Sequence, residues 1–177
     1  MTTPSPAGLI SRLGSAHDAV SFAGFVLGAG AIGLIVVIYA YEVTMRYFFV
    51  APTMWASDFV SFLLLFSVFL VMPWLTREGG HVAVTLLPDI LPERIGALLL
   101  RLGWVAGAAA CLWAAWISLQ ENIVLFERGT ATLTVVRFPK WTLTAVITYG
   151  LLNSGLYFTR LGIVGAKGTQ GNGDRHA

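Results

Sequence analysis

Charged residues are scarce in this sequence. Only 11% of its 177 residues are Asp, Glu, Lys or Arg, and 56% are hydrophobic, whereas a soluble domain has about 25% charged residues. Long stretches have no charge at all, so a soluble fold would have to bury them on every side. The composition therefore disfavours a soluble globular protein and indicates a membrane protein.

The residues that usually hold cofactors are also few. The single cysteine, Cys111, cannot form an internal disulfide. The three histidines, His17, His81 and His176, lie outside the apolar stretches, where they cannot ligate a haem between helices. No Cys/His pair has metal-site spacing, and no Gly-rich phosphate loop is present. We therefore expect no cofactor, no metal and no catalytic site.

Four uncharged apolar stretches dominate the chain. They cover residues 19–41, 59–75, 102–120 and 141–159. Trp55 and Trp74 bracket the second stretch, and the helix between them would measure about 28 Å, close to the bilayer core. A membrane β-barrel would instead alternate apolar and polar residues. The pattern predicts an all-α protein, an integral membrane four-helix bundle.

The distribution of Lys and Arg predicts the orientation of the chain. With four spans both termini lie on one side, and that side would hold seven of the 11 basic residues. Cytoplasmic loops are enriched in Lys and Arg, so we expect cytoplasmic N- and C-termini. The predicted parts are a cytoplasmic segment (residues 1–18), a membrane domain (19–164) and a Gly-rich, flexible cytoplasmic tail (165–177).

Small residues recur at helical spacing and predict contacts between helices, because they let two backbones approach. The first stretch has Gly24 and Gly28, with Ala29 and Gly33 repeating the spacing, and the third has Gly103, Gly107, Cys111 and Ala115. Whether the third-span stripe meets a helix of this chain or another protein stays open. A stripe of Phe59, Phe62, Phe66 and Phe69 is expected to face lipid or a partner.

Inside the four stretches the polar side chains are hydroxyls and amides, including Ser118, Thr148 and Asn153. Such groups often join helices, whereas translocation paths usually contain ionisable residues. A passive subunit of a larger assembly is therefore favoured. Two alternatives stay open: an autonomous small multi-span carrier or channel that acts as a homo-oligomer, and a membrane subunit of a redox system or enzyme.

The ends of the first two stretches carry paired charges. Glu42 and Arg46 are four residues apart with the acid first, which favours an ion pair on a helix that stops before Pro52. Asp58 opens the second helix. It can join that pair or complement the positive end of the helix dipole, and both roles can hold together.

The central part of the sequence resembles the small membrane subunit (DctQ type) of tripartite ATP-independent periplasmic (TRAP) transporters. The resemblance is carried by Arg46-Tyr47-Phe48-Phe49, Pro52, Trp55-Ala56-Ser57-Asp58, the apolar helix after it, Arg77-Glu78-Gly79-Gly80-His81-Val82-Ala83-Val84 and Pro92, with Pro139-Lys140-Trp141 opening the last span. It implies a multi-pass protein of the bacterial inner membrane that is not an enzyme.

The resemblance also implies partners. A periplasmic substrate-binding protein would capture an organic acid, and a large membrane subunit would move it inward with the sodium gradient. The small subunit, embedded in the lipid bilayer, would scaffold the large one and help dock the binding protein. No nucleic-acid partner is expected.

The resemblance gives the residues at the span ends their expected roles. Arg46, Trp55 and Asp58 would shape the periplasmic end of the first hairpin, and Arg77 and His81 would anchor the cytoplasmic connection. The loop over residues 121–140, with Arg137, is a second expected docking surface. The full set of structural or interface residues is Glu42, Arg46, Trp55, Asp58, Arg77, His81, Arg137 and Trp141.

Overall fold

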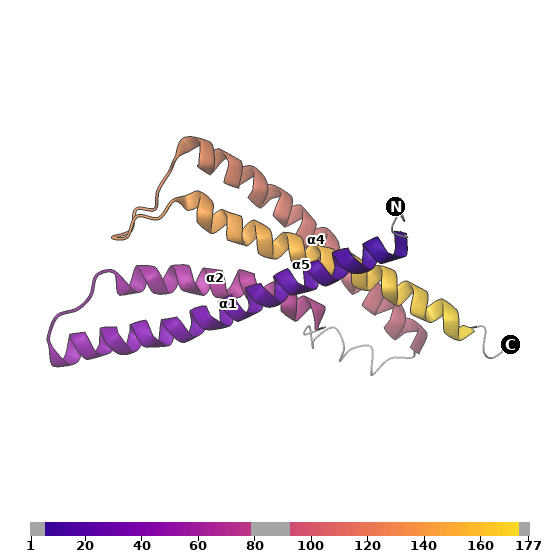
Figure 1. Ribbon diagram of the computed structural model, residues 1–177, viewed down its shortest axis with the longest axis horizontal. Coiled ribbons are helices and arrows are strands. Elements are labelled where there is room, and N and C mark those ends of the chain that lie inside the picture. Colours follow the sequence, from indigo (N-terminus) through magenta and orange to yellow (C-terminus); the bar gives the residue numbers. More distant parts are fainter. Residues whose placement is uncertain (1–5, 79–92, 174–177) are drawn as a thin grey trace, which may run out of the picture.

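The computed structural model describes residues 6–78 and 93–173, and this part of the chain is helical throughout apart from its loops (Figure 1). The helices are α1 (Pro6–Phe48), α2 (Ala56–Arg77), α4 (Glu93–Arg128) and α5 (Lys140–Gly173). The described residues form no strand, only an isolated bridge between Ala131 and Pro139. The all-α prediction is confirmed, and each predicted span lies within one helix.

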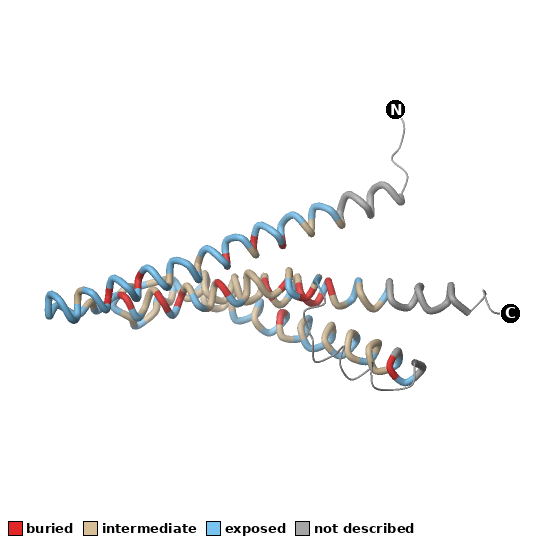
Figure 2. The backbone as a smooth tube through the Cα atoms, turned by 90° about the horizontal axis from the view of Figure 1, so that it is seen from below, coloured by how far each residue is buried: buried red, intermediate tan, exposed pale blue. Residues whose placement is uncertain are grey.

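The four helices pack as two hairpins joined through α2 and α5. α1 packs against α2, α2 against α5, and α5 against α4, so their order across the molecule is α1, α2, α5, α4. The α1–α2 and α4–α5 loops lie at the same end (Figure 1). Helix α5 is central: from Trp141 to Leu151 every residue is buried or half-buried, whereas much of α1 is exposed (Figure 2).

Three of the described helices are long and apolar enough to cross a membrane. These candidate spans are Gly14–Phe48, Ala56–Arg77 and Leu98–Arg128. Helix α5 is not among them because threonine, serine and asparagine residues lower its hydropathy. Its neighbours α2 and α4 flank it on both sides, so protein rather than lipid surrounds much of its surface. The predicted fourth span remains a prediction.

Glycines mark the closest helix contacts. A Cβ on Gly28 of α1 would lie 2.6 Å from Val71 of α2, and one on Gly107 of α4 would lie 3.3 Å from the Phe158 ring of α5. The third-span stripe therefore meets a helix of its own chain. Gly33 lies on a different face of α1 and has open space beside it, so it contacts no helix of the described chain.

The phenylalanine stripe of α2 also packs within the chain. The ring centroid of Phe62 lies 5.2 Å from that of Phe138, and the Phe59 ring contacts Phe138 too. The prediction of a lipid-facing or partner-facing stripe is wrong for these two residues. The α4–α5 loop folds over the start of α2 and covers Phe59 and Phe62. The spacing of the stripe along α2 could not predict this contact with a distant loop.

Two helix ends bear on the predicted boundaries. Helix α1 ends at Phe48, before Pro52, as predicted, and Val50 takes the left-handed conformation (φ 50°) while the Ala51 N–H bonds to the Met45 carbonyl. Helix α5 continues to Gly173, into the range predicted as a flexible tail. A helix that is already nucleated extends at little cost, one hydrogen bond per residue. Residues 174–177 lie outside the described part.

Candidate functional site

The loop end of the molecule contains a buried carboxylate, Glu42, near the end of α1. Glu42 is 6% exposed. Arg46 Nη2 donates to its Oε1 (2.7 Å), and the Thr53 backbone N–H donates to its Oε2 (3.0 Å). The predicted ion pair of Glu42 and Arg46 is thus present, and Glu42 also ties the α1–α2 loop to α1. The Arg46 side chain remains 58% exposed, so it can meet a partner.

Trp55 and Asp58 lie at the start of α2, and each contacts a different neighbour. The Trp55 ring packs against Tyr41 of α1 and edge-on against Phe59. Asp58, in the first turn of α2, accepts a hydrogen bond from the Val136 backbone N–H (3.3 Å). Asp58 forms no ion pair with Arg46 in the described structure. It therefore complements the N-terminal end of α2 and holds the second loop.

Trp141 opens α5, and a polar residue of α4 fixes its backbone. Asn122 Nδ2 donates to the Trp141 carbonyl (2.6 Å) and to Thr144 Oγ1 (2.8 Å). The Trp141 ring packs edge-on against Phe126. Arg137 is exposed in the loop before α5. The structure thus places Arg46, Trp55, Asp58, Arg137 and Trp141 at one end of the molecule.

The opposite end contains a cluster that the sequence interpretation did not single out, and we call it the Asp18 cluster. It consists of His17, Asp18 and Ser21 of α1, Arg77 of α2, and Asn153, Tyr157 and Arg160 of α5. Asp18 faces two guanidinium groups, Arg77 Nε (3.5 Å) and Arg160 Nη1 (3.2 Å). One carboxylate therefore joins three helices.

Aromatic and hydroxyl groups complete the Asp18 cluster. The buried Tyr157 hydroxyl lies 2.9 Å from Asp18 Oδ1 and 3.1 Å from Ser21 Oγ. The His17 ring stacks on Tyr157 (4.2 Å), and its Nε2 lies 2.8 Å from Asn153 Oδ1. These contacts make the cluster a clamp between α1 and α5.

The predicted interface residue Arg77 belongs to this cluster, and its guanidinium also lies 4.5 Å above the Trp74 ring. His81, the other residue predicted at this end, lies outside the described residues. A signal for the cluster was present in the sequence, because Asp18, Arg77 and Arg160 each flank an apolar stretch on the same predicted side. Sequence alone did not show that they meet.

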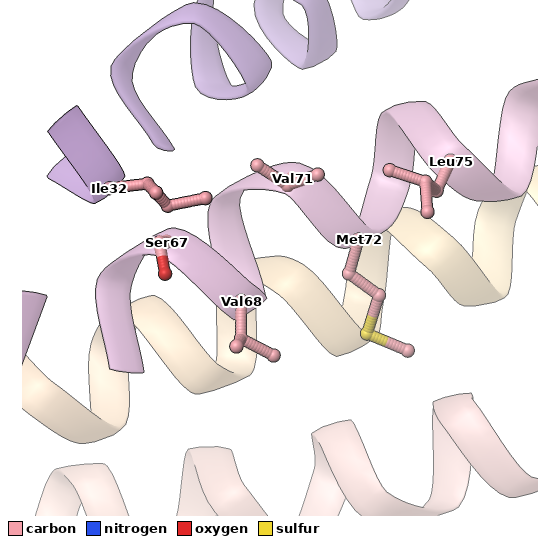
Figure 3. Close-up of a pocket in the computed structure, with 6 residues that line it drawn as sticks. All are labelled: Ile32, Ser67, Val68, Val71, Met72 and Leu75. Atoms are coloured by element: carbon pink, nitrogen blue, oxygen red, sulfur yellow. The ribbon is translucent and has the colours of Figure 1, made fainter. Parts of the chain in front are cut away.

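An apolar groove lies between α1 and α2 (Figure 3). Its volume is ≈ 360 Å³, and its lining consists of Ile32, Ser67, Val68, Val71, Met72 and Leu75. The only hydroxyl there, Ser67 Oγ, donates to the Leu64 carbonyl. Such a lining suits lipid chains or an apolar side chain and offers nothing to bind a carboxylate.

Among the side chains that the structure describes, no three His, Cys, Asp or Glu gather as a metal site. The polar groups of α4 and α5 bond to one another instead, as Ser118 Oγ does with Thr148 Oγ1 (2.8 Å). The fold and these contacts define the class: a helical membrane protein whose polar side chains join helices.

Comparison with protein families identifies which family of membrane proteins the chain belongs to. The family model of the DctQ component of tripartite ATP-independent periplasmic transporters matches residues 35–160, and the chain belongs to this family. It is therefore a TRAP transporter small permease subunit. A search of curated proteins returned no match. The matched range runs from α1 through most of α5 and includes both loops at the Glu42 end.

Proposed function

We propose that this chain is the non-catalytic scaffold subunit of a sodium-driven TRAP transporter in the bacterial inner membrane. It holds the large transport subunit in place and helps to dock the periplasmic substrate-binding protein during organic acid uptake. The family match supports the assignment to the transporter. The observation that carries the scaffold role is the way polar groups bond to each other across the helices.

Several polar side chains within the predicted spans serve contacts between or within helices, although Ser154 Oγ is buried without a hydrogen-bond partner in the described structure. Ser118 of α4 bonds to Thr148 of α5, Asn153 Nδ2 donates to the Tyr149 carbonyl one turn earlier in α5, and Ser61 Oγ donates to the Ser57 carbonyl one turn earlier in α2. Translocation paths usually need ionisable or accessible polar groups in the membrane. A chain that uses these groups for packing suits a support role, while the large subunit carries the substrate.

The outer helices offer apolar surface for the large subunit. Helix α1 exposes Val26, Leu27, Val36 and Val37, and helix α4 exposes Leu102, Val105, Trp113 and Trp116. Lipid or another membrane helix covers such faces, and association in lipid depends on close packing. Gly30 and Gly33 of α1 have open space beside them, so a partner helix can approach there.

The docking surface is proposed at the loop end, with the exposed charges Arg46 and Arg137 and the ring of Trp55. The excess of Lys and Arg on the other side supports a periplasmic location for this end and cytoplasmic termini. In this orientation the Asp18 cluster lies at the cytoplasmic side. Arg77 anchors the cytoplasmic connection there, together with His81.

Reconstitution of defined subunits tests the proposal. Proteoliposomes are prepared with the large subunit alone, with this chain alone and with both, and the binding protein is added outside. We expect sodium-dependent uptake of an organic acid only when both membrane subunits are present. The two subunits should also co-purify in a fixed ratio.

Two results would contradict the scaffold role. Uptake by this chain alone, as a homo-oligomer, would assign the transport path to it. Full uptake by the large subunit without this chain would remove the need for a scaffold. For the docking surface, charge reversal at Arg137 is expected to weaken binding-protein docking without changing co-purification, and unchanged docking counts against that part of the proposal.

A further inference from the structure

The α4–α5 loop has an unusual distribution of polar and apolar side chains. Residues 131–139 alternate between exposed and half-buried positions. The outward positions include Leu133, which is fully exposed, and Val135, which is 65% exposed. The inward positions include Thr132 and Thr134. Over residues 132–135 this is the reverse of the usual arrangement in water, whereas Val136 and Phe138 face inward and Arg137 outward. The apolar edge formed by Leu133 and Val135 therefore suits an apolar environment.

The inward residues fix the shape of the loop. Thr134 Oγ1 donates to the Val136 carbonyl (2.7 Å), and the Phe138 N–H donates to Thr132 Oγ1 (2.9 Å). The Thr132 N–H in turn donates to the Phe138 carbonyl (2.8 Å). The apolar edge is thus held outward by bonds within the loop, and no rearrangement is needed to present it.

The same bonds remove a barrier to lipid contact. An unsatisfied backbone N–H or C=O in an apolar medium costs several kcal/mol. Here the N–H groups of Thr132, Val136, Phe138 and Lys140 all have acceptors, in Phe138, Asp58, Thr132 and Thr130 respectively. The inward-facing positions of the loop can therefore approach the hydrocarbon boundary without breaking these backbone hydrogen bonds.

Contacts with α2 set the depth of the loop. Val136 bonds to Asp58, and Phe138 packs against Phe59 and Phe62. Asp58, Phe59 and Phe62 belong to the first two turns of the candidate membrane span Ala56–Arg77. The loop therefore lies beside the end of a span, at the level of the lipid headgroups, and its apolar edge continues the apolar surface of the helices.

From the outward apolar pair, the bonded backbone of the inward positions and the depth together, we propose that the α4–α5 loop is an interfacial membrane anchor, in which Leu133 and Val135 insert into the lipid leaflet at this end. The bilayer, and not a protein, is the partner of this edge. The inference goes beyond the scaffold function and does not depend on it, because it requires only that α2 spans the membrane. Arg137 follows Leu133 and Val135 in the same outward register, and its long side chain can keep the guanidinium at the headgroup level beside the inserted edge.

Spin-label accessibility tests the anchor in the assembled transporter. Cys111→Ala removes the native thiol, and a nitroxide is attached at Leu133→Cys or, separately, at Val135→Cys. The matched control is Glu127→Cys, an exposed position in the last turns of α4. The complex is placed in phosphatidylcholine and phosphatidylglycerol vesicles, and collisions with oxygen and with a nickel chelate are measured.

The anchor predicts opposite orders of oxygen and nickel collision rates at the loop positions and at the control position. At Leu133 and Val135 oxygen collisions should exceed nickel collisions, because oxygen concentrates in lipid, and at Glu127 the order should be opposite. The same nickel-dominated ratio at all three positions would place the edge in water and overturn the anchor. Low access of both reagents to Leu133 and Val135, in the membrane complex itself or only after the binding protein is added, would mean that a protein covers the edge. That result would overturn the anchor as well. Co-purification and uptake are measured on the same samples, so failure of the scaffold role is seen separately.

Discussion

Replacement of Asp18 by alanine should destabilise the chain by about 2–3 kcal/mol. Its two ion pairs involve arginines that are 35% and 52% exposed, so each contributes about 0.2–1 kcal/mol. The buried Tyr157 hydroxyl loses a charged acceptor, a bond worth about 1.5–3 kcal/mol. In the variant the Tyr157 hydroxyl can donate its hydrogen bond to Ser21 Oγ, 3.1 Å away. We therefore take the lower part of the range of about 1.5–3 kcal/mol for the lost bond.

Unfolding in mild detergent, followed by tryptophan fluorescence against denaturant, measures the effect. Asp18→Asn should cost about 1 kcal/mol, because the amide oxygen can still accept from Tyr157 while both ion pairs are lost. Salt at about 1 M should reduce the difference in unfolding free energy between Asp18→Asn and the unmodified chain, because it screens the two ion pairs. Glu121→Ala, an exposed carboxylate with no ion pair among the described residues, is the control.

Two outcomes would refute the reasoning about the Asp18 cluster. Equal stability of Asp18→Ala and Glu121→Ala would show that the carboxylate does not hold the helices. A double-mutant cycle of Asp18→Ala with Tyr157→Phe is expected to give a coupling of about 1 kcal/mol. A coupling near zero would show that the hydroxyl and the carboxylate do not interact.

Five further substitutions, at Glu42, Gly150, Gly33 and Val50, test other parts of the structure by the same unfolding assay. Glu42→Ala should cost about 2 kcal/mol more than Glu42→Gln, since the amide keeps an acceptor for the loop N–H, and equal losses would contradict the role of Glu42 in holding the loop. Gly150→Ala should cost about 1–3 kcal/mol because a Cβ there would overlap the Phe69 carbonyl, whereas Gly33→Ala, with open space, should be neutral or stabilising. Val50→Gly should stabilise by about 1 kcal/mol, since a β-branched residue is strained at a positive φ, and a loss of stability would show that the Val50 side chain makes a needed contact.

The sequence predicted the local features of the fold well. The uncharged stretches lie within the helices, and the four-residue spacing of Glu42 and Arg46 corresponds to an ion pair. It predicted less well which groups meet across helices. The sequence predicts that Asp58 interacts with Arg46 or with the helix dipole. It does not predict the hydrogen bond that Asp58 accepts from Val136, 78 residues away. Spacing along one helix contains no information about the rotation of its neighbours.

Sequence by itself determined the solvent, the helices and the family of this protein. Hydropathy and small-residue spacing act within one helix, so they can be read along the chain. Tertiary structure alone decided that the most polar helix, α5, lies in the centre, that Asp18 joins α1, α2 and α5, and that Leu133 and Val135 point outward. The physical reason is that a polar side chain in a membrane protein is stabilised by the partners it meets, and the order and rotation of the packed helices choose those partners.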